Sequence, residues 1–401
     1  MEFGLYVHLP YCRSLCPYCA FAKAPLHHAE PERLLAALAC EGTLAAAEAP
    51  GAWEPRRPRT VYVGGGTPTA LDPGALRAFL AWLRGAFDLA RVREFTIEAN
   101  PEGLTDAKLE VLREGGVTRV SLGVQSLEPA VLRTLGRIHT AGAALDALAR
   151  IRAHGFANRS VDLMVAVPGE TEAGLARALD ALIEAAVPHV SVYALQVEPG
   201  TPLAGKAARG RFEAPGDDVA AARYGLVAER LAAAGYRHYE VSNFAKPGFE
   251  SRHNEGYWMR RPYLGLGPGA HSFDGTRRWG NVEDVAAYMA RIESGSLPRE
   301  GTTLLTERDA GEESLFLGLR RARGVRRSAL ARFARDAAPA WTRWAADAGA
   351  VRLDLPGRVR PTERGLLTAH EVASELLARV ATAGGGAPGR GSGNASISNH
   401  L

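Results

Sequence analysis

The sequence predicts an α/β fold: a partial (β/α)6 barrel of the TIM type, followed by a small C-terminal winged-helix-like α+β domain. Three observations predict it. Apolar, β-branched runs alternate with long alanine- and leucine-rich runs, which is the pattern of βα units around a parallel sheet. Polar or glycine-rich residues follow the apolar runs, where parallel barrels carry their chemistry. The last part of the chain changes to short helices followed by a hairpin pattern.

The barrel elements follow in order along the chain. The expected strands are residues 5–9, 60–63, 94–97, 119–124, 160–165 and 189–195, and the expected helices are residues 31–48, 73–87, 105–114, 141–154, 171–186 and 217–234. Asp72 and Thr105 are suitable caps for two helix starts, and Gly115 follows the end of one helix. Residues 239–244 read as one further strand.

The expected domain organisation has four parts. Residues 1–240 form the barrel, 241–303 an extension and connector, 304–380 the C-terminal domain, and 381–401 a disordered tail rich in Gly, Ser and Asn. The C-terminal domain is expected to contain helices at 307–321, 328–335 and 339–348, and a hairpin at 351–355 and 358–361.

Composition narrows the class of protein. The 401 residues are 46% hydrophobic, enough for a large core, and the net charge of +4 is too balanced to indicate a nucleic-acid or membrane-surface role. A group of arginines in the C-terminal domain is compatible with DNA binding, but the motifs described below favour a substrate lid or partner surface, and we expect no nucleic-acid partner; the group contains Arg320, Arg321, Arg323, Arg326 and Arg327. No secretory signal or membrane-spanning run is visible, which predicts a cytoplasmic protein. Cys40 reads as a helix-face core residue.

Three of the four cysteines, Cys12, Cys16 and Cys19, lie in one short loop after the first expected strand. Thiolates prefer soft metal centres, and three ligands leave one coordination position open for chemistry. Two plainer interpretations remain open at this point. The cysteines could hold a zinc ion together with a histidine such as His8 or His27, or they could be buried residues without a ligand role.

The spacing Cys-x-x-x-Cys-x-x-Cys, with Tyr18 before the last cysteine, closely resembles the signature loop of the radical SAM enzymes. The resemblance implies a 4Fe-4S cluster whose open iron chelates S-adenosylmethionine. The glycine run 64–66, directly after the second strand, resembles the family segment that binds the methionine amino group. Without side chains, such a run lets backbone groups approach a ligand closely.

The first 280 or so residues resemble the coproporphyrinogen-oxidase-like branch of this family. Carboxylates can accept hydrogen bonds from ribose hydroxyls, and an arginine can pair with a carboxylate. The resemblance implies that S-adenosylmethionine is contacted by Tyr6, Tyr18, Gly65, Gly66, Thr67, Glu98, Gln125, Arg137 and Asp162.

The segment His253-Asn-Glu-Gly-Tyr257-Trp258 is the third motif. A histidine beside aromatic rings can ligate an iron porphyrin, although such residues are more often interface packing. The pattern His-Asn-x-x-Tyr-Trp resembles a motif associated with heme binding in the heme-chaperone members of the branch. That resemblance implies that His253, Tyr257 and Trp258 contact heme.

Two features separate the chaperones from the oxygen-independent coproporphyrinogen III oxidases. The oxidases have a further cysteine where this chain has Phe21, and they carry an N-terminal extension for which the eleven residues before Cys12 leave no room. The resemblance therefore implies a heme chaperone that delivers heme to acceptor hemoproteins such as respiratory enzymes. Whether it is also an enzyme stays open, and the oxidase and a zinc-binding interaction protein with a winged-helix tail remain alternatives. A homodimer and transient contact with membrane proteins are further partner expectations.

Overall fold

The computed structural model describes residues 2–48, 53 and 56–383; residues 1, 49–52, 54–55 and 384–401 lie outside the description. The expected tail, residues 381–401, falls almost entirely outside the described residues. Its predicted start is wrong for residues 381–383, because they complete helix α15 (Ala369–Ala383).

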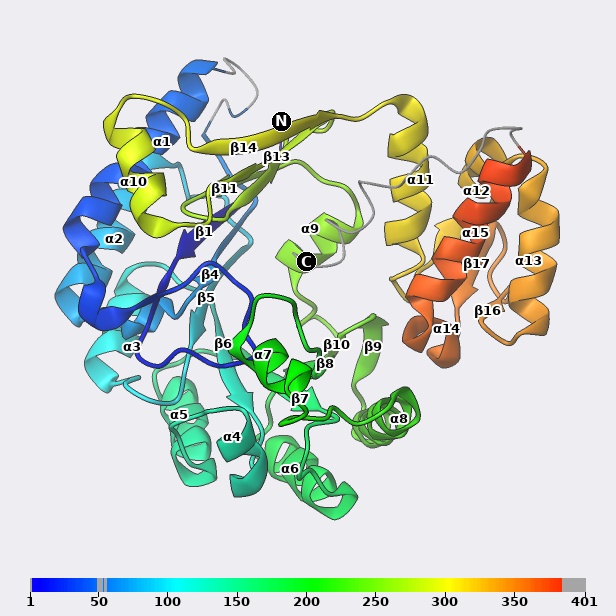
Figure 1. Ribbon diagram of the computed structural model, residues 1–401, viewed down its shortest axis with the longest axis horizontal. Helices are drawn as coiled ribbons and strands as arrows, with labels where there is room; N and C mark the ends of the chain where they lie inside the picture. Colours follow the sequence, from blue (N-terminus) through cyan, green and yellow to red (C-terminus); the bar gives the residue numbers. More distant parts are fainter. Residues whose placement is uncertain (1, 49–52, 54–55, 384–401) are drawn as a thin grey trace.

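All six predicted barrel strands are present and parallel, in sequence order across the sheet (Figure 1). Each is short, apolar and largely buried, as expected for strands covered on their outer face by helices. They are β1 (Gly4–Leu9), β4 (Thr60–Gly65), β5 (Glu94–Ala99), β6 (Arg119–Gln125), β7 (Asn158–Val165) and β8 (His189–Ala194). Gly4 pairs with Thr60, and Thr60 pairs with Glu94, so the amino ends of three strands are level.

The sheet continues beyond the predicted strands on both sides. A seventh parallel strand, β11 (Tyr263–Leu266), pairs with β1, and the antiparallel strands β12 (His271–Phe273), β13 (Arg277–Asn281) and β14 (Arg299–Leu304) follow it. The sequence did not predict β11, because this short strand contains Gly265 and glycine has low strand propensity. Gly265 is required there, since an added Cβ would lie 2.1 Å from the carbonyl oxygen of His271.

The single strand predicted at 239–244 is wrong. The segment instead forms two short antiparallel strands, β9 (Arg237–Glu240) and β10 (Asn243–Ala245), of which β10 pairs with β8. The Glu240 carboxylate closes the turn between them, because it accepts hydrogen bonds from the Ser242 backbone N–H at 3.3 Å and from the Asn243 side chain.

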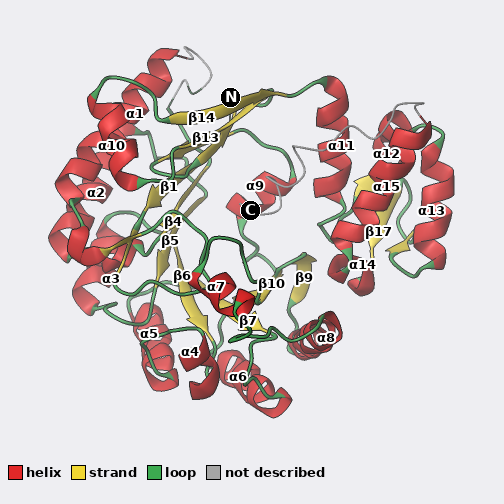
Figure 2. Cartoon of the chain, viewed as in Figure 1, coloured by secondary structure: helices red, strands yellow, loops and turns green. Residues whose placement is uncertain are grey.

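Helices cover the outer face of the barrel (Figure 2). Asp72 caps one of them by accepting from the backbone N–H groups of Gly74 and Ala75, and Thr105 caps another, as predicted. The helices before the C-terminal domain are α1 (Pro31–Glu48), α2 (Pro73–Ala86), α3 (Asp106–Glu114), α4 (Pro129–Thr134), α5 (Ala141–Ala153), α6 (Glu172–Glu184), α7 (Pro202–Ala208), α8 (Asp217–Ala233), α9 (Arg252–Trp258) and α10 (Val285–Glu293).

The C-terminal part has its own apolar core around the fully buried Trp341, whose indole N–H donates to the Val372 carbonyl at 3.1 Å. The three predicted helices and the predicted hairpin are present, and the winged-helix description stays a prediction. Helix α15 was not predicted. The elements are α11 (Glu307–Gly318), β15 (Val325–Arg326), α12 (Arg327–Ala334), α13 (Ala337–Asp347), β16 (Val351–Arg352), β17 (Arg358–Pro361), α14 (Glu363–Leu367) and α15. Among the described residues, no helix is long and apolar enough to span a bilayer.

Candidate functional site

The cysteine loop leaves the carboxyl end of β1 and is closed at its base by a short parallel pairing between β2 (Tyr11–Cys12) and β3 (Ala24–Pro25). Cys12, Cys16 and Cys19 are half-buried and free of disulfide bonds. Burial raises the pKa of the Cys12 thiol to about 11 and that of Cys19 in the same direction. A metal centre must therefore displace these protons to bind.

His8 anchors the loop from inside the barrel. Its Nε2 donates to the Ala22 carbonyl at 2.7 Å, and its Nδ1 accepts from the Tyr6 hydroxyl at 3.0 Å. Burial lowers the pKa of His8 to about 4, so the ring is neutral at physiological pH. With both nitrogens occupied, His8 has no lone pair for a zinc ion, which removes one of the two histidines considered for that alternative.

The glycine run 64–66 lies at the carboxyl end of β4, and each of its glycines is in close contact with other parts of the chain. An added Cβ on Gly64 would lie 2.8 Å from the Glu98 carboxylate, and one on Gly66 would lie 2.5 Å from the Pro10 carbonyl. Gly65 has φ +106°, a conformation that side chains disfavour. The glycines thus let the β4 loop pack directly onto the start of the cysteine loop.

A chain of hydrogen bonds joins the loops at the carboxyl ends of the strands. The Thr67 hydroxyl lies 3.8 Å from the Cys12 sulfur and accepts from Asn100 Nδ2 at 2.8 Å. Asn100 Oδ1 accepts from Arg137 Nη2 at 2.6 Å, and Arg137 Nη1 lies 3.5 Å from the Cys16 sulfur. The predicted residues Cys12, Cys16, Thr67 and Arg137 are therefore brought together, with Asn100 at the centre.

Tyr18 fixes the far side of the cysteine loop. Its ring packs on a small apolar cluster that includes Val131 of α4, Leu135 directly after α4, and Met164 of β7. Next to it, the Pro17 carbonyl accepts from the Leu203 backbone N–H at 2.9 Å. The loop consequently crosses the mouth of the barrel and is held on both sides.

Two carboxylates project into the barrel interior. Glu98 accepts from the Tyr62 hydroxyl at 2.7 Å and from the Gly65 backbone N–H at 3.1 Å, and Asp162 lies 3.3 Å from the Ser121 hydroxyl. Burial raises the pKa of Glu98 to about 7 and that of Asp162 to about 6, and their mutual repulsion adds to the Glu98 shift. Both keep some solvent contact, so a ligand in the interior can reach them.

The remaining predicted residues lie on the same interior surface. The Tyr6 ring lies 6.2 Å from the Tyr62 ring, and Gln125 ends β6 with φ +63°. A non-glycine residue in that conformation is strained, and such strain is concentrated at functional sites. Gln125 is thereby placed beside Gly123, whose carbonyl accepts from Arg137 at 2.9 Å.

Sequence reasoning missed three residues of this surface: Asn100, Tyr62 and Tyr193. Asn100 follows β5 directly, at the carboxyl end of the strand. Tyr62 stands between Val61 and Val63, and an isolated polar-tipped residue in such a run is the signal for an inward-facing position. Tyr193 is 42% exposed although it lies within a barrel strand, which also marks the open interior.

The chemistry of the donor set fits an iron–sulfur cluster, because its three side chains are thiols whose thiolates prefer soft metal centres. Across residues 2–48, 53 and 56–383, no three His, Cys, Asp or Glu side chains are arranged so that they could hold one metal ion. Cysteines around a cubane bind different iron atoms, so they need not converge on one point. Ligation by the cysteine trio remains a prediction.

The third motif lies at the opposite end of the barrel. The Glu94 carboxylate at the start of β5 accepts from the backbone N–H groups of Arg252 at 3.1 Å and His253 at 3.0 Å, at the amino end of α9. The cysteine loop leaves the other end of β1. Five residue steps of about 3.3 Å, or roughly 16 Å, separate the two ends of that strand.

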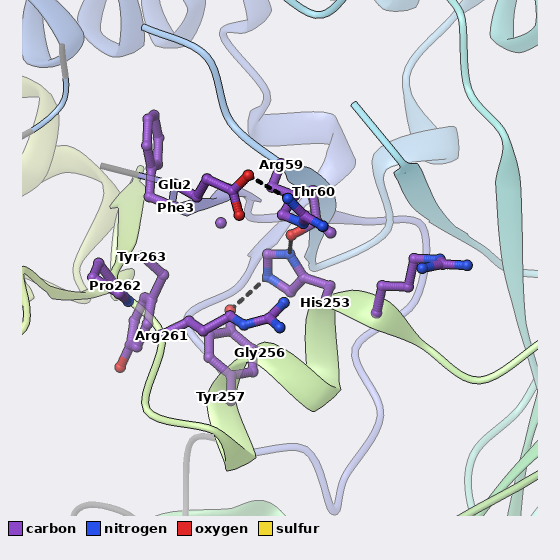
Figure 3. A pocket seen from close by; sticks show the side chains of 12 residues that line it. Glu2, Phe3, Arg59, Thr60, His253, Gly256, Tyr257, Arg261, Pro262 and Tyr263 are labelled. Atoms are coloured by element: carbon purple, nitrogen blue, oxygen red, sulfur yellow. Dashed lines mark hydrogen bonds and ion pairs between the residues drawn. The ribbon is translucent and has the colours of Figure 1, made fainter. Parts of the chain in front are cut away.

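His253 is buried, and both its ring nitrogens are occupied. Nδ1 lies 2.9 Å from the Thr60 hydroxyl, and Nε2 lies 2.8 Å from the Tyr257 hydroxyl (Figure 3). Burial lowers the pKa of His253 to about 3. The hollow beside it leaves about 20 Å³ for the centre of a water molecule, which is room for about one water. In this conformation both ring nitrogens contact hydroxyl groups, and the contact of His253, Tyr257 and Trp258 with heme stays a prediction.

The other residues of the motif join the barrel to the C-terminal domain. The Trp258 ring packs against the C-terminal core, and Glu255 forms an ion pair with Arg321 at 2.9 Å. Tyr257 faces the barrel, with its ring 4.7 Å from that of Tyr263. Helix α9 is thus a joint between the two parts, as its position in Figure 1 shows.

Comparison with known proteins agrees with this architecture. Residues 6–182 match the model of the radical SAM superfamily. A cysteine loop after the first strand of a partial parallel barrel, with glycine and carboxylate residues on the following strands, defines the chain as a radical SAM protein.

Curated relatives define the family more closely. The chain is 42% identical to the heme chaperone HemW of Mycobacterium tuberculosis over 94% of this chain and 95% of that protein. It is 37% identical to HemW of Bacillus subtilis over 80% of this chain and 84% of the relative. The chain belongs to the HemW family.

A solved structure has the same fold. Coproporphyrinogen III oxidase (HemN) of Escherichia coli, a radical SAM enzyme, superposes with a TM-score of 0.80 at 22% identity, covering 94% of this chain and 90% of that one. At 22% identity, this similarity shows only that the two proteins share a fold.

Proposed function

We propose that this protein is a heme chaperone that holds a 4Fe-4S cluster on Cys12, Cys16 and Cys19, binds S-adenosylmethionine beside it, and transfers heme to acceptor hemoproteins. The observation that carries the proposal is similarity along nearly the whole chain: relatives named heme chaperones share 42% identity over 94% of it. Phe21, at the position where the oxidases have a further cysteine, is consistent with this function.

The residues around the cysteine loop support the cofactor part of the proposal. When bound, the cluster and S-adenosylmethionine would supply electron transfer and sulfonium chemistry. Arg137 would offset negative charge at the sulfur of Cys16, and Asn100 holds the Arg137 guanidinium in position. Glu98 and Asp162 offer acceptors for hydroxyl groups in the barrel interior.

Anaerobic reconstitution tests the cluster. We expect iron and sulfide to bind to the wild-type protein and to be lost when Cys12, Cys16 and Cys19 are replaced together by alanine. Cys40→Ala is the matched control, because Cys40 packs against the core from α1 and should leave loading unchanged. A wild-type protein that takes up zinc but no iron and sulfide would refute the proposal.

The heme part needs a test that separates ligation from folding. If His253 binds iron, His253→Ala should abolish the hemin Soret change, whereas Thr60→Val, which only frees Nδ1, should retain or strengthen it. If His253 has only its structural role, both variants should weaken hemin binding in proportion to their loss of stability. Such parallel weakening in both variants would mean that a residue other than His253 ligates the heme iron.

Transfer and oxidase activity are then distinguished directly. A hemin-loaded chaperone should convert an apo-hemoprotein to its holo form faster than free hemin of equal concentration does. Decarboxylation of coproporphyrinogen by the reconstituted protein, without such transfer, would instead establish the oxidase alternative.

A further inference from the structure

Four arginines line one hollow at the amino end of the barrel. Arg59, Arg93, Arg252 and Arg261 surround it together with Thr60, Glu255 and Met259, and about 150 Å³ is open to the centre of a water molecule. The small hollow beside His253 and Tyr257 shares Arg59, Thr60, Arg252 and Arg261 with it (Figure 3). The arginine hollow is therefore continuous with the barrel-facing side of α9.

The positive charge of this hollow is poorly compensated. Arg59 forms an ion pair with Glu2, and the Glu255 carboxylate forms an ion pair with Arg321, which lies outside the hollow. Arg93, Arg252 and Arg261 are exposed and form no ion pair with any residue that the structure describes. Cations gathered in a concave surface attract an anion, and a guanidinium presents paired N–H groups that match a carboxylate or phosphate.

We propose that the arginine hollow is a carboxylate-binding site that takes the propionate edge of a heme. The identity of this ligand rests on the proposed function. Heme carries two carboxylates on one edge, which suits several convergent arginines. The hollow is too small for the macrocycle, which stays outside it, so first contact depends on the propionates and leaves the His253 hydrogen bonds intact.

Porphyrin titrations test the site independently of iron ligation. Metal-free protoporphyrin IX should bind the full-length protein about tenfold more tightly than its dimethyl ester, as expected for loss of charge-assisted hydrogen bonds. Arg252→Gln and Arg261→Gln should each weaken binding of the acid about tenfold and leave binding of the ester unchanged. Arg177→Gln on the exposed surface of α6 is the matched control.

The outcomes separate this site from the proposed function. If hemin and protoporphyrin IX bind equally well to the wild type and both arginine variants, the arginine site is refuted and heme binding stands. If neither binds the wild type, both proposals fail. If micromolar inorganic phosphate displaces protoporphyrin IX, the hollow is a phosphate site and the carboxylate assignment is overturned.

Discussion

Replacing Gly66 by alanine should disrupt the cofactor site through backbone contacts alone. An added Cβ would lie 2.5 Å from the carbonyl carbon and oxygen of Pro10 and 2.8 Å from the backbone nitrogen of Tyr11. All three atoms belong to the chain that begins the cysteine loop, so no flexible side chain can move away. Overpacking of this kind costs about 1–3 kcal/mol, and relief requires β4 and the cysteine loop to separate.

Gly85→Ala provides the matched control. Gly85 is exposed near the end of α2, and an added Cβ there meets nothing within 4 Å. Alanine in a helix is more favourable than glycine by roughly 0.5–1 kcal/mol, so this variant should be slightly stabilised. The same Gly→Ala substitution should therefore lower the free energy of unfolding at position 66 and raise it at position 85.

Urea unfolding of the cluster-free protein and iron content after anaerobic reconstitution measure both effects. We expect Gly66→Ala to lower the free energy of unfolding and to reduce cluster loading, while Gly85→Ala keeps full loading. If Gly66→Ala retained the stability and iron content of the wild type, the packing of the glycine run onto Pro10 would be refuted.

Three further predictions concern the interior and the anchoring network. Tyr62→Phe removes the hydroxyl that donates to Glu98 and stabilises its ionised form, so the pKa of Glu98 should rise above about 7. The pH midpoint of S-adenosylmethionine binding should then move upward. An unchanged midpoint would contradict a role of the Glu98 carboxylate in binding. Asn100→Ala leaves Thr67 and Arg137 without their shared partner, which should cost about 1–3 kcal/mol in urea unfolding and lower iron content, and normal loading would exclude the positioning role. His253 has a folded pKa of about 3 against 6.5 when unfolded, so its contribution is full above pH 6.5 and is lost as the pH falls toward 3. Between pH 8 and 5 this loss is about 2 kcal/mol, and His253→Asn should show that much less acid destabilisation in urea titrations; equal slopes would argue against a buried neutral imidazole.

The sequence alone was sufficient for the six predicted parallel strands, because each is a short apolar run, and several helices have a capping residue such as Asp72 or Thr105. It was not sufficient for β11, where Gly265 is required by close contact with His271 and lowers the strand propensity of the segment. Contacts between segments far apart in sequence were also hidden, as for Asn100, which joins Thr67 to Arg137. The His253 motif was predicted from resemblance, but its burial depends on Thr60 and Glu94, which no local pattern connects to it.

A column of side chains runs through the barrel from Glu98, through the Tyr62 hydroxyl and ring, to His253 and Tyr257. The Tyr62 and His253 rings are 5.3 Å apart, so the column is continuous between the two ends of the strands. If a ligand that displaces Tyr257 also shifts His253 and Tyr62, it moves the hydrogen-bond donor to Glu98. Thermodynamic linkage would then make the effect reciprocal, so that occupancy beside the cysteines and occupancy beside α9 would alter each other's affinity by the same factor.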